Sequence, residues 1–389
     1  MSVSHSASRL LHNPKVRNTA VQALVVVLFL VVAYEVTSNL ITNLRRANIH
    51  SGFDFLSARA GFEIDKPLID YNGNSTYGRA LVVGLLNTIL VAVAGIILST
   101  IVGFMVGVGR LSRNWLLAKI CTVYVETFRN LPPLLVIFFL YIGILQFLPQ
   151  PRQSVRLPLG VYLNNRGITF PRPIFEDGFG IVLIAVCVAV LASFLAARWA
   201  RARQAATGKQ FHTVWTSVGF LVAVPLLAFL GTGRPIAFDY PTLGTFNLKG
   251  GAVIGPEFIA LLLALSLYTA SYIAEIVRSG ILGVPQGQTE ASKAMGLSPS
   301  ATMRLVVLPQ AFRIIIPPLT SQYLNLTKNS SLAIAIGYSD LVAVGGTILN
   351  QTGQAVEVIT IWMATYLCLS LATSAFMNWF NSKMALVER

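Results

Sequence analysis

The sequence predicts an all-α polytopic membrane protein. Of its 389 residues, 54% are hydrophobic and only 11% are charged, whereas a soluble domain carries about 25% charged residues. The second observation is the length of its apolar runs, because several reach the roughly 20 residues that a spanning helix needs. Composition and run length together favour several membrane spans over a soluble domain.

Eight apolar runs qualify as spans. The first run follows a long polar lead, and no small-residue cleavage site comes after the run, so we interpret it as a retained span and not a signal peptide. The third contains "NLPPLL", and Pro132 and Pro133 predict a kink or a split there. The seventh carries Pro317, Pro318 and Lys328 and is expected to be bent or broken. The expected spans are 21–40, 79–109, 118–148, 179–197, 214–233, 257–278, 314–336 and 355–380.

The net charge of +14 indicates topology and not nucleic-acid binding, because the Lys and Arg residues lie in short segments between apolar runs. With the N-terminus inside, the inner segments hold sixteen Lys and Arg and the outer segments ten. Acidic residues show the opposite bias, with two inside and eight outside. We therefore expect both termini to be cytoplasmic, in contact with membrane lipid and with no nucleic-acid partner.

The expected domain organisation is a first span with an outer segment at 1–78, followed by a transmembrane domain at 79–389. Within the latter we expect an inserted two-span hairpin at about 179–233 and a cytoplasmic loop at 279–312. The part of the outer segment at 41–78 has mixed charge, Gly and aromatic residues, which is typical of a folded rim. The "GFMVG" motif suits close helix packing. The Cys and His residues show no metal-ligand spacing, so we expect no metal and no catalytic site.

The stretch "EASKAMGLSPSATMRLVVLP" is too polar to insert in a membrane. Pro285 suits the first turn of a short helix and Gly296 suits its end. Ser298 can cap a second helix that begins at Pro299, and Pro309 is expected to break the run before the next span. The residues predict two short helices joined by a Gly-Leu-Ser elbow on the cytoplasmic side, where another protein can grip them. An ordinary interfacial loop is the alternative on periodicity alone.

This stretch resembles the cytoplasmic loop of permease subunits of ATP-binding-cassette (ABC) importers. The family pattern is Glu-Ala-Ala, three residues, Gly, nine residues, Ile, one residue and Leu-Pro. Here Glu290, Ala291, Ser292 and Gly296 keep that spacing, which ends at Pro309. The stretches "ETFRNLPPLLVIFFLYIG", "SYIAEIVRSGILGVPQGQTEASKAMGLS" and "LTKNSSLAIAIGYSDLV" are similar to the polar-amino-acid branch of this family, which includes the general L-amino-acid transporters.

The resemblance implies a type I ABC importer transmembrane domain in the bacterial inner membrane. It implies a second permease subunit, two ATP-binding-cassette ATPase subunits and a periplasmic amino-acid-binding protein as partners. ATP is then bound and hydrolysed by a partner, so this chain is expected to be no enzyme and to carry no cofactor. The extra first span and the inserted hairpin depart from the usual five-span permease.

For ATPase coupling, the resemblance places the site at Glu290, Ala291, Ser292, Gly296 and Pro309. Glu290 would offer charge to a basic partner, Ala291 would permit close approach and Gly296 would make the sharp turn. A rigid, capped helix is what such a coupling element requires. A plain helix end at Gly296 is the alternative, and it produces the same shape.

For the substrate path, ionisable and polar residues inside spans are the candidates. An amino acid is a zwitterion, so the anionic Glu275 and the cationic Lys328 in one cavity would suit its two ends. The alternative for Glu275 is an ion pair with Arg278, three residues on. The alternative for Lys328 is to cap the carbonyls of a broken helix. The full candidate set is Asn87, Thr88, Tyr272, Glu275, Lys328, Asn329 and Ser330.

An ion-coupled secondary transporter of amino acids is the alternative function. It would need its own ion site and usually two similar halves, which the sequence does not display. A membrane enzyme would need convergent carboxylates, His or Cys, and none of the four His residues lies in an expected span.

Overall fold

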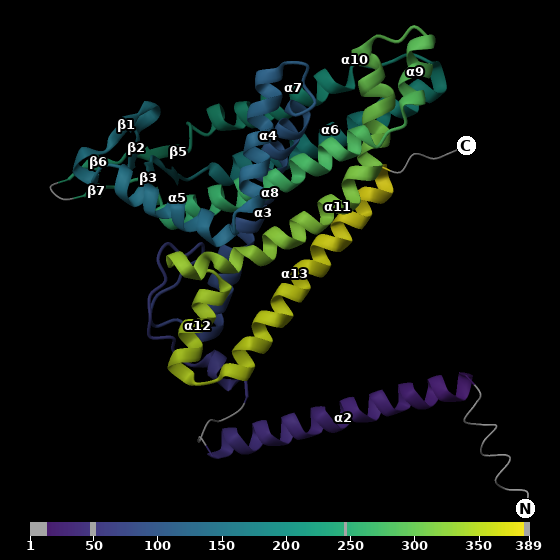
Figure 1. Ribbon diagram of the computed structural model, residues 1–389. Helices are drawn as coiled ribbons and strands as arrows, with labels where there is room; N and C mark the ends of the chain where they lie inside the picture. The colour runs from purple at the N-terminus through teal and green to yellow at the C-terminus, as the bar shows by residue number, and fades with distance from the viewer. Residues whose placement is uncertain (1–13, 47–51, 245–246, 385–389) are drawn as a thin grey trace, which may run out of the picture. The chain divides into compact units, whose positions relative to one another are not determined.

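The computed structural model describes residues 14–46, 52–244 and 247–384, and these are predominantly helical (Figure 1). Within them, seven helices are long and apolar enough to cross a membrane, and one bent pair makes an eighth candidate. Each of the eight expected spans coincides with one of these, which confirms the predicted fold class. The long helices are α2 Pro14–Arg46, α3 Tyr77–Gly109, α4 Trp115–Asn130, α5 Pro133–Phe147, α6 Phe179–Thr207, α7 Thr213–Gly231, α8 Pro256–Leu282, α11 Leu308–Asn329 and α13 Ala355–Met384.

Short helical elements connect the long helices. Several begin with a residue suited to that position: Ser298 caps α10 and Asp340 caps α12 through side-chain oxygens. These elements are η1 Asp54–Ser57, η2 Pro151–Gln153, η3 Pro158–Gly160, α9 Gln286–Ala294, α10 Pro299–Thr302, the π-helical η4 Met303–Val307, the 3-10 helix η5 Ser330–Ile336 and α12 Leu341–Thr352.

The chain folds as two compact units. Unit 1 contains the residues up to Val125 and from Thr269 onward, and unit 2 is Glu126–Tyr268. In unit 2, α6 and α7 pack along each other, and Ser193 Oγ donates to the Ser217 carbonyl at 3.4 Å. These two helices coincide with the hairpin expected at about 179–233.

Unit 2 also contains short antiparallel strands that the sequence analysis did not predict. The largest sheet has the order β1-β2-β3-β8, and β2 and β3 form a hairpin in which Asn164 faces Gly167. Asn164 Oδ1 accepts from the Arg166 backbone nitrogen at 2.8 Å and so supports the tight turn. The strands are β1 Val155–Leu157, β2 Val161–Asn164, β3 Gly167–Phe170, β4 Arg172–Phe175, β5 Ile236–Asp239, β6 Thr242–Leu243, β7 Leu248–Lys249 and β8 Ala252–Ile254.

In unit 1, α9 and α10 lie at one end of α11, whereas α12 lies at the other end (Figure 1). At the α12 end, residues 52–76 fold against α3, α12 and α13, and Phe55 and Ile64 join the same buried cluster as Leu341 and Val358. This part of the segment is therefore a folded rim, as predicted. Residues 41–46 of the expected outer segment instead continue helix α2. Residues 47–51 lie outside the described residues, as do 1–13 and 385–389 at the chain ends.

The two proline-containing spans behave differently. The third is split as predicted: α4 ends at Asn130, Pro132 precedes α5, and the two helices are bent by 108°. In the seventh, α11 continues through Pro317 and Pro318, and the α-helix is interrupted further along the expected span, where 3-10 geometry begins at Ser330.

Pro309 does not break the run either. It lies at the start of α11, directly after the π-helical turn Met303–Val307, and α10, η4 and α11 follow one another without a gap. In this turn the Leu308 nitrogen donates to the Met303 carbonyl, a π-type spacing that changes the hydrogen-bond register where proline has no N–H to give.

Candidate functional site

Helix α9 and its elbow have the predicted shape. Pro285 stands at the N-cap of α9, and Gly296 has φ +77°, the left-handed conformation that glycine adopts most easily. The Gly296 nitrogen donates to the Lys293 carbonyl at 2.9 Å, and the Leu297 nitrogen donates to the Ser292 carbonyl at 3.1 Å. These are the paired bonds of a Schellman helix end, so the turn between α9 and α10 is specified by local hydrogen bonds.

The coupling candidates divide into an exposed face and a buried support. Glu290 and Ala291 are exposed on α9, whereas Ser292 is only 4% exposed and its hydroxyl donates to the Gln288 carbonyl at 2.7 Å. Gln310 Nε2 of α11 donates to Gln288 Oε1 at 3.3 Å, which attaches α9 to the start of the next span. One face of α9 is therefore available to a partner and the other is fixed to unit 1.

Met295 was missed by the sequence analysis. Its side chain is 80% exposed at the end of α9, outside the candidate spans. A single exposed apolar side chain is common on protein surfaces, so Met295 is a candidate only because it lies at the end of the same short helix as Glu290 and Ala291. The signal available in the sequence was a large apolar residue directly before the elbow glycine in a polar segment.

Glu275 forms an ion cluster at the α9 end of unit 1. Its carboxylate pairs with Arg110, which follows α3, and with Arg278 Nη1 at 3.2 Å. Ser279 Oγ donates to the same carboxylate at 3.4 Å. The pairing with Arg278 is the alternative weighed for this residue, and Arg110 is an additional partner from 165 positions away.

Lys328 lies at a different level of unit 1. Leu326, two residues before it, faces Gly95 of α3, since a Cβ at Gly95 would lie 3.1 Å from the Leu326 side chain. Glu275 pairs with Arg110, which comes fifteen residues after Gly95. At a rise of 1.5 Å per residue, Gly95 and Arg110 are about 22 Å apart along the axis of α3. Glu275 and the segment around Lys328 therefore contact different parts of α3, and their joint role in binding a zwitterion stays a prediction.

The polar residues of α3 hold the segment before α12. Asn87 Nδ2 donates to the Ser339 carbonyl at 2.8 Å, and Thr88 Oγ1 accepts from the Leu341 nitrogen at 3.1 Å. Ser330 is fully buried and its hydroxyl donates to the Thr327 carbonyl at 2.7 Å. Of the remaining substrate-path candidates, Lys328 is exposed, and Tyr272 and Asn329 are half-buried.

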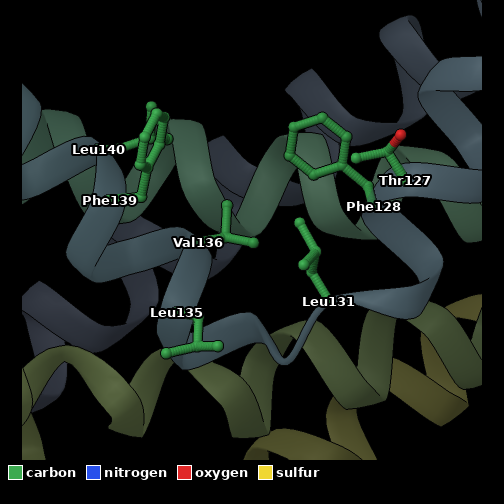
Figure 2. A pocket seen from close by; sticks show the side chains of 7 residues that line it. All are labelled: Thr127, Phe128, Leu131, Leu135, Val136, Phe139 and Leu140. Atoms are coloured by element: carbon green, nitrogen blue, oxygen red, sulfur yellow. The ribbon is translucent and has the colours of Figure 1, made fainter.

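An apolar pocket of about 430 Å³ lies at the bend between α4 and α5 (Figure 2). Its only polar lining side chain is that of Thr127, so it offers no charge to either end of an amino acid. The lining residues are Thr127, Phe128, Leu131, Leu135, Val136, Phe139 and Leu140.

No group of three or more His, Cys, Asp or Glu side chains in the described part of the chain is arranged to hold a metal ion. The features that the geometry offers are a capped helix with an exposed face, a partly buried ion cluster and a buried polar junction.

Comparison with known proteins supplies the family. Residues 95–386 match the family described as "Binding-protein-dependent transport system inner membrane component". The general L-amino acid transport system permease protein AapQ of Rhizobium johnstonii is 63% identical over 97% of this chain and 95% of its own length. The putative amino-acid ABC transporter permease protein YhdX of Escherichia coli is 48% identical over 97% of this chain and 96% of its own.

A third relative carries a more specific name. The glutamate/glutamine/aspartate/asparagine transport system permease protein BztB of Rhodobacter capsulatus is 42% identical, over 98% of this chain and 97% of its own. All three comparisons run over nearly the whole length of both proteins, so they include the first span, the hairpin and the loop around α9. The chain belongs to the family of inner membrane components of binding-protein-dependent transport systems.

Proposed function

We propose that this chain is the permease subunit of an ATP-driven, binding-protein-dependent amino-acid importer. The observation that carries the proposal is α9: a capped nine-residue helix with an exposed face, fixed from behind, in a chain of this family. The substrate class follows from the relatives, whose names specify general L-amino acids or the acidic amino acids and their amides.

The proposed partners are those that an importer of this kind requires. A second permease completes the translocation path, and two ATPase subunits bind and hydrolyse ATP, so this chain carries no cofactor. Glu290, Ala291 and Met295 form the face of α9 that contacts an ATPase subunit, with Gly296 setting the turn. Ser292 is buried on the opposite side of α9, where Gln310 attaches the helix to the following span, and Pro309 lies at the start of that span.

The proposed orientation places α9 and both chain ends in the cytoplasm of a bacterial inner membrane. Because α8 crosses the membrane between the short strands and α9, the strands then lie on the outer side. Residues 52–76 and α12 lie at the end of α11 away from α9 and also face outward. This outer side is where an amino-acid-binding protein delivers its substrate.

The substrate path is proposed to use the accessible candidates Tyr272, Lys328 and Asn329. Asn87, Thr88 and Ser330 act on this path as positioning residues, since their hydrogen bonds hold neighbouring segments. Glu275 contributes through its pairing with Arg110, which joins α3 to α8 near the coupling end.

The test is co-purification of this chain with its native subunits from membranes, followed by ATPase activity stimulated by the loaded binding protein. Glu290→Ala and Met295→Ser alter only the exposed face of α9, and Gly296→Pro alters the turn. Lys209→Ala, in the exposed loop between α6 and α7, is the matched control. We expect the α9 variants to lose the ATPase or its stimulation and the control to keep both.

The contrary result is equally well defined. If the chain purifies alone and an ion gradient drives amino-acid uptake without ATP, it is a secondary transporter and the proposal fails. If the ATPase is present and stimulated equally in wild type, Glu290→Ala and Met295→Ser, then α9 is not the coupling element.

A further inference from the structure

The Asp340 carboxyl is buried at the start of α12. Its side chain is 0% exposed and caps α12, with Oδ1 accepting from the Ala343 nitrogen at 2.8 Å. The cap accounts for one carboxyl oxygen. The other, Oδ2, is buried and has no hydrogen-bond partner among the described residues.

Helices α3 and α13 hold the same point of α12 from two sides. Thr88 of α3 accepts from the Leu341 nitrogen at 3.1 Å, and Trp362 Nε1 of α13 donates to the Leu341 carbonyl at 3.1 Å. A Cβ at Gly84 of α3 would lie 3.0 Å from the Asp340 carbonyl oxygen, so the two backbones are in close contact. The Asp340 side chain is therefore enclosed where α12 meets α3 and α13.

The groups that face Asp340 are uncharged at neutral pH. Tyr366 of α13 lies against the carboxyl and also near Thr88 and Ser330, and its own hydroxyl is a second buried oxygen with no hydrogen-bond partner in the described part of the chain. Tyr338 approaches from the segment that precedes α12. The described residues that interact with Asp340 include no Lys, Arg or His.

A buried carboxylate without a cationic partner is strongly unfavourable, whereas the neutral acid is tolerated and has a proton to donate. Burial raises the pKa of Asp340 from 3.8 to about 7, against the smaller opposing effect of the backbone donors and Tyr366.

We propose that Asp340 is a proton-dependent positioning residue, whose neutral carboxyl holds α12 against α3 and α13 and whose ionisation loosens that junction during transport. The proton is exchanged with water when α12 moves away and the carboxyl becomes hydrated. The transport part of this inference rests on the proposed importer function. The inference that Asp340 is protonated while α12 is packed does not rest on that function.

The sign of the pH dependence follows from the raised pKa. Below about pH 4 the carboxyl is protonated whether or not α12 is packed, so ionisation causes no loss of stability. Between about 4 and 7 only the packed form keeps the proton, and its stability falls as the pH rises. Above about 7 both forms are ionised and the loss is constant.

The experiment compares wild type with Asp340→Asn in the complete transporter, in lipid nanodiscs, from pH 5 to 8.5. Asparagine keeps the capping oxygen and the side-chain size but cannot ionise. Asp54→Asn, at an exposed carboxyl in η1, is the matched control. Resistance to denaturation and ATP-driven amino-acid uptake are both measured.

We expect the folded-to-unfolded ratio of wild type, relative to Asp340→Asn, to fall about tenfold per pH unit from 5 to 7 and then to level off. Wild-type uptake is expected to decline with a midpoint near pH 7, and Asp340→Asn uptake to lack that transition. Tyr366→Phe is expected to move the wild-type midpoint upward, because Tyr366 favours the ionised form.

A stability difference that does not change with pH would overturn the protonation of Asp340. A pH-dependent stability difference with identical uptake profiles in wild type and Asp340→Asn would overturn its role in transport. If the complex carries no amino acids at all, the proposed importer function fails, but the stability comparison still decides whether the buried carboxyl is protonated.

Discussion

Replacing Gly107 with alanine tests how closely α3 and α8 must approach. A Cβ at Gly107 would lie 2.7 Å from the Ala274 carbonyl oxygen and 2.8 Å from Val277 Cβ. Neither atom belongs to a flexible side-chain end, so the two helices must separate. Restoring an ordinary contact of 3.4 Å requires about 0.7 Å of displacement, from 3.4 minus 2.7.

The expected cost combines two opposing effects. Overpacking a rigid contact costs about 3 kcal/mol at the upper end of its usual range, and alanine recovers about 1 kcal/mol over glycine in a helix. We expect a net loss of about 2 kcal/mol in the free energy of unfolding, roughly thirtyfold in the folded-to-unfolded ratio. The separation would also weaken the ion pair of Arg110, three residues further on, with Glu275.

The assay is denaturation of the purified chain by sodium dodecyl sulfate in mixed micelles, followed by tryptophan fluorescence. Gly219→Ala in α7 is the control, because a Cβ there meets nothing within 4 Å. That variant is expected to be neutral or stabilised by up to about 1 kcal/mol. If Gly107→Ala is as stable as Gly219→Ala, the close packing of α3 on α8 does not exist in the protein.

Two further variants address the ion cluster and the elbow. Arg110→Ala is expected to destabilise unit 1 by about 2 kcal/mol, because the partly buried Glu275 loses its better-buried partner. Glu275→Gln should rescue most of that loss, and a double-mutant cycle in the same denaturation assay measures the coupling; additive losses would refute the pair. Ser298→Ala removes the oxygen that accepts from the Ala301 nitrogen at 3.3 Å, with an expected cost of about 1 kcal/mol. Faster amide hydrogen exchange confined to α10 would support this role, and unchanged exchange would contradict it.

Features set by near neighbours in the chain were predictable from the sequence. The apolar runs, the split at Pro132 and the capped turn around Gly296 each depend on residues within a few positions of one another. Proline and glycine act through their own backbone preferences, so their effects can be predicted without the rest of the fold. The continuity of α11 through the exposed Pro317 marks the limit, since the buried Ile316 and Leu319 on either side keep that stretch of helix packed in the core.

The short strands were beyond the sequence analysis for a related reason. Segments of two to four residues between spans have too little periodicity to be recognised, and β3 is completed by β8, whose residues lie more than eighty positions later. Their pairing is decided by the return of the chain after α6 and α7.

The sequence by itself determined that this chain crosses a membrane several times, that it has a rigid polar elbow before a late span, and which family it resembles. Only the tertiary structure decided that the Glu275 carboxylate forms an ion pair with Arg110 and not with Lys328. The same holds for the burial of the Asp340 carboxyl without a cationic side chain beside it. Charge and exposure at those residues depend on helices more than one hundred positions apart in the chain. Such partners are selected by the packing of α3 against α8, α12 and α13, which no local pattern of residues specifies.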